Sequence, residues 1–493
     1  MGKKARTVYV VAGIMAVGVG LRFMLIGSKS LWLDEAGMAW RVWQPFGLML
    51  SDVIAHDTHP PLYYVLVYGW KAVFGWGDAS LRGFSAAMGV VTIPLVYALG
   101  GLLFDRKTGA AAALLFAVSS YQVYFGQEAR LYALTGLLGV LATYLFARVV
   151  VGKGRVWSWA GYGVTAAACV YTYYYLIFLF VAHGIAVIGW CLLGKGEDGA
   201  RARALWWKWA LCMACAAAAS SPLIPVVLRR MAEAKGGALD VARDTGLGGW
   251  VIPNMLREFV HGYFVLGGEW VHFVYLAVAL VPLVAAQRWL KEKSAGVVMM
   301  YAWIVVPIVC VAILPVKIHV FESKHLLFVS PAAYLLIAFV VTRMRMWGAA
   351  LLAAVLMTNV GSHAVYFDPE FEKEDWREVA SVIRQGLSKG DAIYLNPAWL
   401  AFPLRRYWQV PSYVTVYASG EGFDKALLEE MLSGRERVWV VEDFSRVVGP
   451  DRESSDYLKE RLRVHEKVLD EDYFMGSIRV WLLRRGRVDE RGQ

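Results

Sequence analysis

The chain has 493 residues, of which 58% are hydrophobic and 18% charged, with a mean hydropathy of +0.47. Soluble globular proteins carry about 25% charged residues, so this composition excludes an ordinary soluble protein and indicates a membrane protein. Residues 1–363 hold 16 acidic and 30 basic side chains, whereas residues 364–493 hold 24 acidic and 20 basic ones. Because the basic residues flank hydrophobic stretches, they indicate orientation in a bilayer and not nucleic-acid binding.

The cysteine pattern argues against a disulfide framework, and the lack of a phosphate-binding loop motif argues against an ATP-driven pump. All five cysteines lie in apolar runs, which argues against a disulfide framework: Cys169, Cys191, Cys212, Cys215 and Cys310. The chain has no G-x-x-x-x-G-K-[ST] loop, so we do not expect an ATP-driven pump. We expect neither a metal ion nor a cofactor.

Hydrophobic windows close to the length needed to cross a bilayer recur along the first three quarters of the chain. They predict about eleven transmembrane helices, near residues 7–26, 83–103, 109–125, 131–151, 156–175, 176–193, 205–227, 271–286, 296–315, 326–342 and 347–363. The first window lacks a small-residue cleavage site, so we interpret it as an uncleaved anchor. Every second loop is basic, which predicts a cytoplasmic N-terminus and an extracytoplasmic C-terminal region in the cytoplasmic (inner) membrane.

Three segments on the predicted outer side are longer than a connector needs, and loops of that length are usually functional. They are residues 27–82, residues 229–271, and the tail from Tyr366 onward. The tail alternates expected helices (Asp375–Ser388, Phe423–Ser433, Arg452–Arg463) with expected strands (Ala392–Leu395, Val438–Val441, Ile478–Leu483). We therefore expect a transmembrane domain over residues 1–363 and a small extracytoplasmic α/β domain over residues 364–493.

Asp34 and Glu35 follow the first window in an apolar and aromatic setting at the outer bilayer surface. A poorly solvated carboxylate at such a place can act as a general base. Acidic residues in the first turn of a helix, stabilised by the helix dipole, explain the same position equally well.

A second cluster, His56 to Tyr64, surrounds a diproline in the first outer segment. The diproline ends any preceding helix and presents the His and Asp side chains before the next helix begins. A metal site formed by His56, Asp57 and His59 is conceivable from the ligand types. Their spacing matches no strong zinc pattern, so we do not predict a metal site.

Two more polar clusters lie at predicted outer ends of spans. Glu128 and Arg130 follow the third window, where charges are costly unless they are paired or engaged with a ligand. A structural ion pair and a functional role are almost equally good interpretations. Lys324 and His325 precede the tenth window, where snorkelling of the lysine side chain is a sufficient explanation by itself.

Taken together, these motifs resemble one specific group of proteins, the bacterial branch of the protein-mannosyltransferase and aminoarabinose-transferase group of GT-C glycosyltransferases (glycosyltransferase family 39-like). The order and spacing are similar across roughly residues 1–340. The resemblance rests on Ser30–Ala36, Asp57–Tyr64, Phe74–Gly75, Leu81–Arg82 and Gln127–Tyr132. It implies a helical GT-C fold, and the tail is similar in kind to the soluble domains that many relatives carry.

The resemblance also implies roles for individual residues. The acidic pair of the first outer loop falls on Asp34 and Glu35, which makes Asp34 the expected base. The second acidic position falls on Glu128. Residues near the donor phosphate fall on His59, where the aminoarabinose transferases carry a lysine, on Arg130, and on the late pair Lys324 and His325.

The expected reaction is an inverting transfer of a sugar from a polyprenyl-phosphate-linked donor to a lipid, glycan or protein acceptor. Negative charge grows on the phosphate as the glycosidic bond breaks, so preorganised cations at the bilayer edge would stabilise the transition state. A carboxylate on the acceptor side completes a direct displacement without a covalent enzyme nucleophile.

Two alternatives come from other classes. A transporter or lipid flippase would place its polar residues near the bilayer midplane, whereas this sequence concentrates them at outer span ends. A non-catalytic assembly or receptor subunit would use the tail as its working part, and an inert Asp34 would favour that interpretation.

Overall fold

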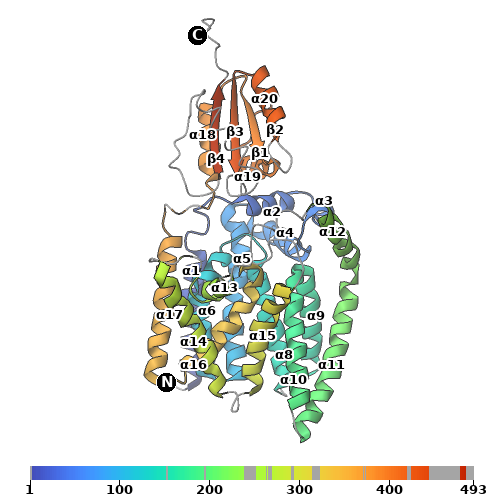
Figure 1. Ribbon diagram of the computed structural model, residues 1–493, viewed down its shortest axis with the longest axis vertical. Helices are drawn as coiled ribbons and strands as arrows, with labels where there is room; N and C mark the ends of the chain where they lie inside the picture. Colours follow the sequence, from blue (N-terminus) through green and yellow to red (C-terminus); the bar gives the residue numbers. More distant parts are fainter. Residues whose placement is uncertain are drawn as a thin grey trace. The chain divides into compact units, whose positions relative to one another are not determined.

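The computed structural model divides the chain into two compact units (Figure 1). It describes residues 3–151, 154–193, 196–237, 251–262, 264, 269–289, 294–313, 323–369, 371, 373–418, 424–443 and 478–484. The membrane unit comprises Met1–Ile26 and Pro45–Phe367, and the C-terminal unit comprises Gly27–Gln44 and Asp368–Gln493. The division differs from the expected one because Gly27–Gln44, in the first outer segment, belongs to the C-terminal unit. The reason is a set of contacts described below.

The membrane unit is a bundle of long apolar helices. Its long helices and their continuations are α1 (Lys3–Phe23), α5 (Asp78–Leu103), α6 (Arg106–Val118), α7 (Ser120–Gly126), α8 (Tyr132–Val150), α9 (Val156–Thr172), α10 (Ile177–Leu193), α11 (Gly196–Ser220), α14 (Glu269–Ala285), α15 (Ser294–Ile313), α16 (Ser330–Val341) and α17 (Arg345–Tyr366). Within the described residues, eight helical segments are long and apolar enough to cross a membrane, and α6 with α7 forms a ninth that is bent by 56°.

The eleven hydrophobic windows all coincide with helices of this bundle. The two windows beyond the nine spans correspond to α1, whose apolar part is Thr7–Phe23, and to α9, which has 17 residues. Hydropathy predicts these spans well because a helix in lipid pairs its backbone N–H and C=O groups within the same segment. The chain is therefore a multi-pass helical membrane protein, as expected.

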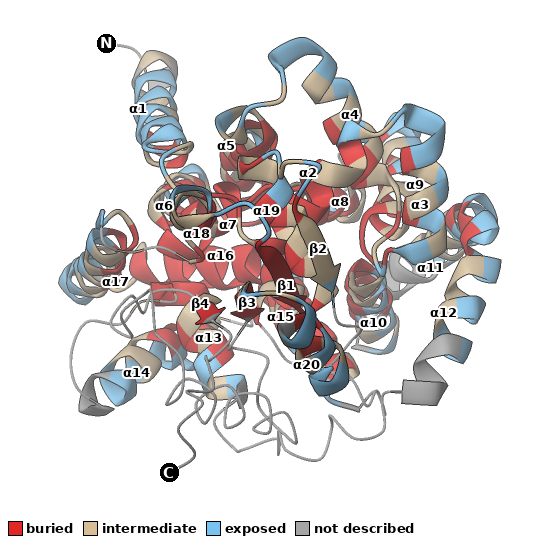
Figure 2. Cartoon of the chain, turned by 90° about the horizontal axis from the view of Figure 1, so that it is seen from above, coloured by how far each residue is buried: buried red, intermediate tan, exposed pale blue. Residues whose placement is uncertain are grey.

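Helix α16 lies in the core of the bundle and is buried along its whole length (Figure 2). Glycines allow other helices to approach closely. A Cβ atom at Gly100 of α5 would lie 2.7 Å from the Cα atom of Gly109 of α6. Small residues at such contacts are the usual means of close packing in membranes.

A buried arginine supports the bend between α6 and α7. Arg22, at the end of α1, is fully buried and donates to the carbonyl oxygens of Phe116 (3.1 Å) and Ala117 (2.9 Å). Those carbonyls lie where the helix breaks at Ser119, whose Oγ instead accepts from the Gln122 N–H. Arg22 thus satisfies backbone groups that would otherwise be exposed to an apolar environment. The sequence analysis did not identify it.

Shorter helices connect the spans. They are α3 (Phe46–His56), α4 (Leu62–Phe74), α12 (Ile224–Gly237), α13 (Val251–His261) and the 3-10 helices η1 (Tyr174–Leu176), η2 (Ser221–Leu223), η4 (Ala286–Trp289) and η5 (Ser323–Val329). The guanidinium of Arg229 in α12 donates to the carbonyl oxygens of Ile54 and Ala55 at the end of α3. Residues 238–250 of the second outer segment lie outside the described residues.

The C-terminal unit is a small α/β structure. It contains α2 (Leu33–Trp43), α18 (Trp376–Gly386), β1 (Ala392–Asn396), η6 (Ala398–Leu400), α19 (Ala401–Tyr407), β2 (Thr415–Ala418), α20 (Lys425–Gly434), β3 (Arg437–Asp443) and β4 (Ile478–Arg484). The strand order is β2-β1-β3-β4, with β4 antiparallel to β3 and the other pairs parallel.

Successive side chains of a strand point to opposite faces of the sheet, and because consecutive residues of β1 are apolar, both faces are covered. Ile393 and Leu395 of β1 lie in a core with α18, α19 and Leu33 of α2. Ala392 and Tyr394 lie in the opposite core with α20. The expected elements at α18, β1, α20, β3 and β4 are confirmed, β2 and α19 were not predicted, and the expected helix Arg452–Arg463 lies outside the described residues.

Candidate active site

The diproline motif forms a closed turn between α3 and α4. Asp57 is the C-cap of α3, and its Oδ1 accepts from the His59 N–H at 2.8 Å. Its Oδ2 accepts from the hydroxyl of Tyr64 at 2.6 Å, in the first turn of α4. Pro61 ends the turn because α4 begins directly after it. Asp57 therefore determines the position of His59.

His56 does not join His59 in a metal site. Its Nδ1 lies 2.9 Å from Oδ1 of Asp52, one helical turn earlier in α3. Among the described residues, no group of three His, Cys, Asp or Glu side chains is arranged to hold a metal ion.

His59 faces an aromatic residue from a distant part of the chain. Its Nδ1 lies 3.0 Å from Oδ1 of Asp57, and its ring stacks on Tyr173 with centroids 5.8 Å apart. The side chain is 14% exposed. Because Nδ1 is bonded to a carboxylate, which can only accept, we assign the Nδ1 proton to this bond.

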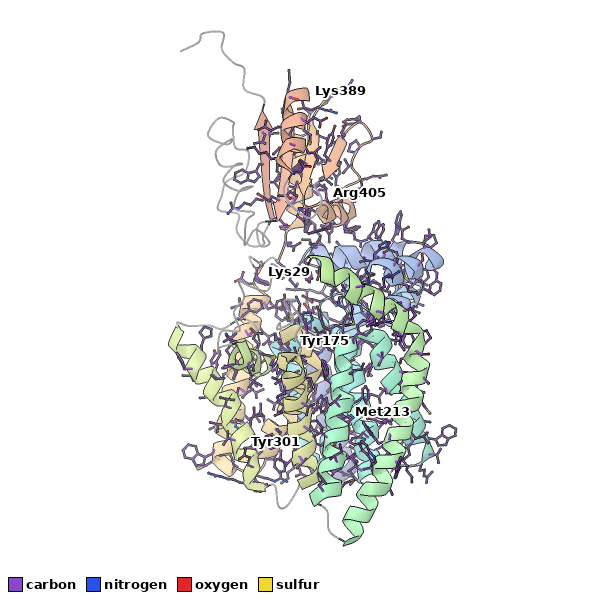
Figure 3. All side chains as sticks on the ribbon, turned by 45° about the vertical axis from the view of Figure 1, so that its right-hand side comes forward. Lys29, Tyr175, Met213, Tyr301, Lys389 and Arg405 are labelled. Atoms are coloured by element: carbon purple, nitrogen blue, oxygen red, sulfur yellow. The ribbon has the colours of Figure 1, made fainter. Side chains whose placement is uncertain are left out.

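Tyr173 also joins His59 to the late pair. It is the extended residue between α9 and η1, and its hydroxyl is hydrogen-bonded to Nδ1 of His325. The His325 ring stacks on Tyr173 at 6.1 Å and on Tyr175 at 5.8 Å; Tyr175 is labelled in Figure 3. The structure therefore brings two predicted phosphate-binding residues, His59 and His325, into one aromatic stack.

The sequence analysis missed both tyrosines of this stack. They lie in the run Tyr171–Tyr175, where the sequence predicts the boundary between two hydrophobic windows. A local signal was present, since aromatic residues gather at span ends, but four tyrosines so close together do not reveal which one turns toward a histidine.

Close packing positions Lys324 and His325. Both side chains are half-buried at the start of η5. The following residues of η5 lie against α8, where a Cβ atom at Gly136 would be 3.2 Å from Leu327 and one at Gly139 would be 3.3 Å from Phe328. Two glycines of α8 thus allow this segment to approach the helix that begins just after Arg130.

Glu128 and Arg130 lie in the turn between α7 and α8, and both are buried. The Arg130 N–H donates to the Glu128 carbonyl at 2.8 Å, and the Arg130 guanidinium lies 6.0 Å from the centre of the Tyr132 ring. Ser85 of α5 donates to the Arg130 carbonyl at 3.0 Å and lies 3.5 Å from the hydroxyl of Tyr63. This chain of contacts connects the Glu128 turn to the diproline motif.

Gln127 holds the same turn against two helix ends. Its Nε2 donates to the carbonyl oxygens of Leu21, Arg22 and Met24 at the end of α1, at 2.8 to 3.3 Å. Its Oε1 accepts from the Tyr366 hydroxyl at 3.0 Å, at the end of α17. The two points where the chain leaves the membrane unit near Ile26 and Phe367 are therefore attached to one glutamine.

Asp34 and Glu35 lie in the first turn of α2, within the C-terminal unit. Oε2 of Glu35 accepts from the Trp32 N–H at 3.3 Å, so this buried side chain caps its own helix. Glu35 therefore has a structural contact at the start of its helix, and its catalytic role stays a prediction. Asp34 is partly exposed.

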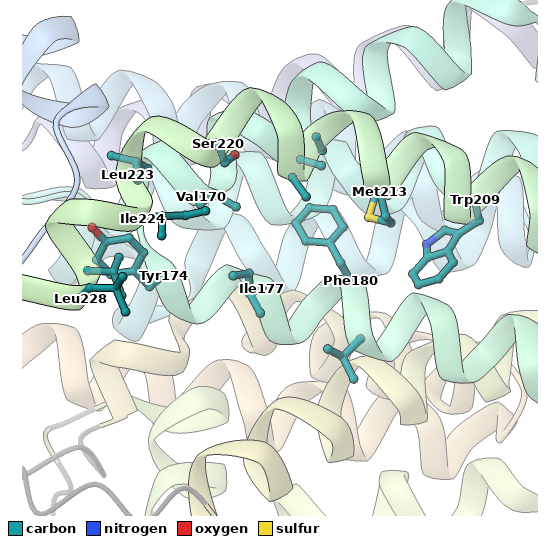
Figure 4. A pocket seen from close by; sticks show the side chains of 15 residues that line it. Val170, Tyr174, Ile177, Phe180, Trp209, Met213, Ser220, Leu223, Ile224 and Leu228 are labelled. Carbon is teal, nitrogen blue, oxygen red and sulfur yellow. The ribbon is translucent and has the colours of Figure 1, made fainter. Parts of the chain in front are cut away.

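An apolar groove of about 570 Å³ lies among α9, α10, α11 and α12 (Figure 4). Tyr174, adjacent to Tyr173 in the chain, lines one end, and Trp209 lines the other. On α11 the lining runs from Ser220 to Trp209, about 16 Å at 1.5 Å per residue. One end of the groove is thus lined by the chain neighbour of Tyr173, and the groove follows the helices from there.

The fold is similar to that of proteins whose structures have been solved. ArnT from Cupriavidus metallidurans, in its apo crystal structure, matches with a TM-score of 0.55 and 12% identity, over 98% of this chain and 97% of that chain. The same protein bound to undecaprenyl phosphate matches with a TM-score of 0.52, 12% identity and the same coverage. The Archaeoglobus fulgidus oligosaccharyltransferase tethered with an acceptor peptide matches with a TM-score of 0.50 and 14% identity, over 90% and 70% of the two chains.

Sequence comparison adds a family match. Residues 58–225 match the family model for dolichyl-phosphate-mannose-protein mannosyltransferase. This stretch contains His59, Glu128, Arg130 and Tyr173, and Asp34 lies outside it. A comparison with curated proteins found no significant match. The family match over residues 58–225 and the shared fold are in line with the expected resemblance to GT-C glycosyltransferases.

Proposed function

We propose that this protein transfers a sugar, with inversion, from a polyprenyl-phosphate-linked donor to an acceptor on the outer face of the cytoplasmic membrane. The observation that carries the proposal is the stack of His59, Tyr173 and His325, together with an apolar groove that Tyr174, the next residue of the chain, lines at one end. A polar aromatic cluster and an apolar groove suit a molecule with an anionic head and a hydrocarbon tail.

The donor phosphate would be bound by Arg130, Lys324 and the two histidines. Arg130 offers a planar fork that matches two phosphate oxygens, and Lys324 offers a single charge. His59, whose Nδ1 is bonded to Asp57, would contact the phosphate through Nε2. As the glycosidic bond breaks, its electron pair stays on the departing phosphate oxygen, and these groups would stabilise the added charge.

The groove would hold the polyprenyl chain. Its walls are aliphatic and aromatic side chains of four helices, and it is long enough for several isoprene units. Transfer of such a chain from lipid to a protein groove gains little from the hydrophobic effect, so shape would decide binding.

Asp34 would take the proton from the acceptor hydroxyl or amine as the acceptor attacks the anomeric carbon on the face opposite the phosphate. The new bond to the sugar forms while the bond to the phosphate oxygen breaks, so no covalent enzyme intermediate is needed. Glu35 would support the turn that carries Asp34, and Glu128 would serve as the second acidic group of the site. The acceptor would be a glycolipid, a polysaccharide or a protein.

Three exposed tryptophans support the proposed orientation. Trp157, Trp207 and Trp347 are 82%, 74% and 69% exposed and lie near Arg155, Lys208 and Arg345. Tryptophans of this kind mark a membrane interface, and basic residues mark its cytoplasmic side. The clusters around Asp34, His59, Arg130 and Lys324 would then lie at the opposite, outer side.

The decisive experiment compares donors on the purified protein in nanodiscs. We expect transfer from a polyprenyl-phosphate sugar and none from a nucleotide sugar; the reverse result would reject the proposal. A second arm tests the groove. Ala217 lines the groove, whereas its neighbour Ala218 does not, so Ala217→Trp should raise KM about 10-fold for a long-chain donor but not for a short-chain one. Ala218→Trp should change neither value.

A further inference from the structure

The segment that precedes Asp34 is attached to residues almost 350 positions later in the chain. Nζ of Lys29 donates to the carbonyl oxygens of Asp368 and Phe371. Ser30 Oγ donates to the carbonyl oxygen of Glu374 at 2.6 Å and accepts from the Trp376 N–H at 3.1 Å. These bonds explain why Gly27–Gln44 belongs to the C-terminal unit.

Glu374 makes the most specific of these contacts. Its Oε2 accepts from the Leu33 N–H at 2.8 Å and from Nε1 of Trp376 at 2.7 Å, and the residue is 7% exposed. Leu33 is the first residue of α2, so its N–H has no partner within the helix. The carboxylate of Glu374 therefore caps α2 from a distant part of the sequence, at the end of the helix where a negative charge is favourable.

Two further contacts hold Leu31 and Leu33, just before Asp34 in the chain. The Leu31 N–H donates to the Tyr407 hydroxyl at 2.6 Å. The side chain of Leu33 is buried in the core that Trp376 and α19 share. Asp34 follows Leu33 directly, so the position of its Cα atom is determined by side chains of the C-terminal unit.

We propose that Glu374 is a positioning residue for Asp34, and that the C-terminal unit is thereby a structural part of the catalytic apparatus. The inference rests on the proposed role of Asp34 as the base. A general base must lie within hydrogen-bond reach of the proton it takes, and a displacement of about 1 Å can lower a rate by about 100-fold. Holding the backbone at Leu31 and Leu33 limits such displacement.

The test uses the full-length protein and two independent readouts. Glu374→Ala should lower kcat by about 10- to 100-fold and leave KM for the donor within about twofold. It should also speed hydrogen exchange at the amides of residues 29–36. Glu374→Gln keeps an acceptor oxygen at the same place and should restore most of both properties.

A double mutant shows whether Glu374 acts through Asp34. In the Asp34→Asn background, Glu374→Ala should lower kcat by less than twofold further, because the base is already absent. Full additivity of the two effects would overturn the proposal. Should Glu374→Ala fail to fold, Tyr407→Phe, which removes the acceptor for Leu31, should give the same change in exchange and a smaller fall in kcat.

Glu442 provides the matched control. It is a buried carboxylate on β3 of the same unit, and its Oε1 accepts from Asn396 at 3.4 Å. Glu442→Ala should not change hydrogen exchange at the amides of residues 29–36. The fall in kcat caused by Asp34→Asn should be the same with and without Glu442→Ala. Unchanged exchange in Glu374→Ala would refute the anchoring, whereas normal turnover in Asp34→Asn would refute the proposed base, so the two failures are distinguishable.

Discussion

The ring of His59 lies on the ring of Tyr173, with centroids 5.8 Å apart and planes inclined by 19°. The hydroxyl of the same tyrosine is bonded to His325. One residue between two helices therefore connects a histidine of the first outer segment to a histidine that lies more than 260 positions later. This connection makes the tyrosine a sensitive point for testing the candidate phosphate site.

Tyr173→Phe keeps the ring stack and removes the bond to His325. Loss of one such hydrogen bond is worth about 1 to 1.5 kcal/mol, so kcat/KM for the donor should fall about 5- to 10-fold, and Tyr173→Ala should lower it further. Steady-state kinetics with a polyprenyl-phosphate sugar measures this. Tyr171→Phe is the control, because the Tyr171 hydroxyl bonds to the Ala219 carbonyl. Equal effects of the two Phe variants would contradict the assignment.

Arg130 and Lys324 should differ in how well each tolerates substitution by the other basic residue. Arg130→Lys replaces a bidentate donor by a point charge and should lower kcat/KM at least about 10-fold, whereas Lys324→Arg should stay within about threefold. Arg148→Lys, at the other end of α8, should have no effect. The measurement is the same donor titration, and full activity of Arg130→Lys would remove Arg130 from the phosphate site.

Asp34→Asn retains the size of the side chain and removes its basic oxygen. Turnover should fall about 100-fold or more, while expression and thermal stability stay close to wild type. Glu35→Gln should be mild because an amide oxygen can still accept from the Trp32 N–H. Asp52→Asn, a carboxylate bonded to His56 in the same outer segment, should be neutral. Normal turnover in Asp34→Asn would assign both acids to the start of the helix.

Arg22→Met should destabilise the membrane unit. It leaves the carbonyl oxygens of Phe116 and Ala117 without their donor, which costs about 1 to 3 kcal/mol for each buried group. The midpoint of thermal unfolding in detergent should fall by about 5 °C or more. Arg148→Met serves as the control, since that guanidinium contacts only the ring of Tyr144 among the interactions described for it. A shift of the same size in both variants would argue against a special role for Arg22.

The orientation can be tested with single cysteines in a background that lacks the native five. Ser51, Lys107 and Ser433 are exposed in the structure, so labelling at each depends on the side of the membrane. A membrane-impermeant thiol reagent should label cysteines at positions 51 and 433 in intact cells, and the one at position 107 only after the cells are opened. The opposite pattern would place the candidate site on the cytoplasmic side.

Local sequence determined much of this protein. The eleven hydrophobic windows coincide with helices because a membrane helix satisfies its own backbone, so hydropathy within one segment is enough to predict it. The strands β1, β3 and β4 followed from short runs rich in apolar, β-branched and aromatic residues, a signal that is equally local. The diproline motif predicted a turn that presents His59, since proline restricts the backbone on both sides.

The tertiary structure decided which distant residues share a site. Tyr173 is one of five adjacent aromatic or polar residues, and only packing of η1 and η5 selects it. Arg22 resembles an ordinary basic residue at the end of a span, and the helix break that it supports lies almost 100 positions away. In the sequence, Glu374 is one acidic residue among many in a polar tail. In the structure it caps α2, which begins about 340 residues earlier in the chain. Such contacts depend on chain segments that meet only after folding, so no local pattern encodes them.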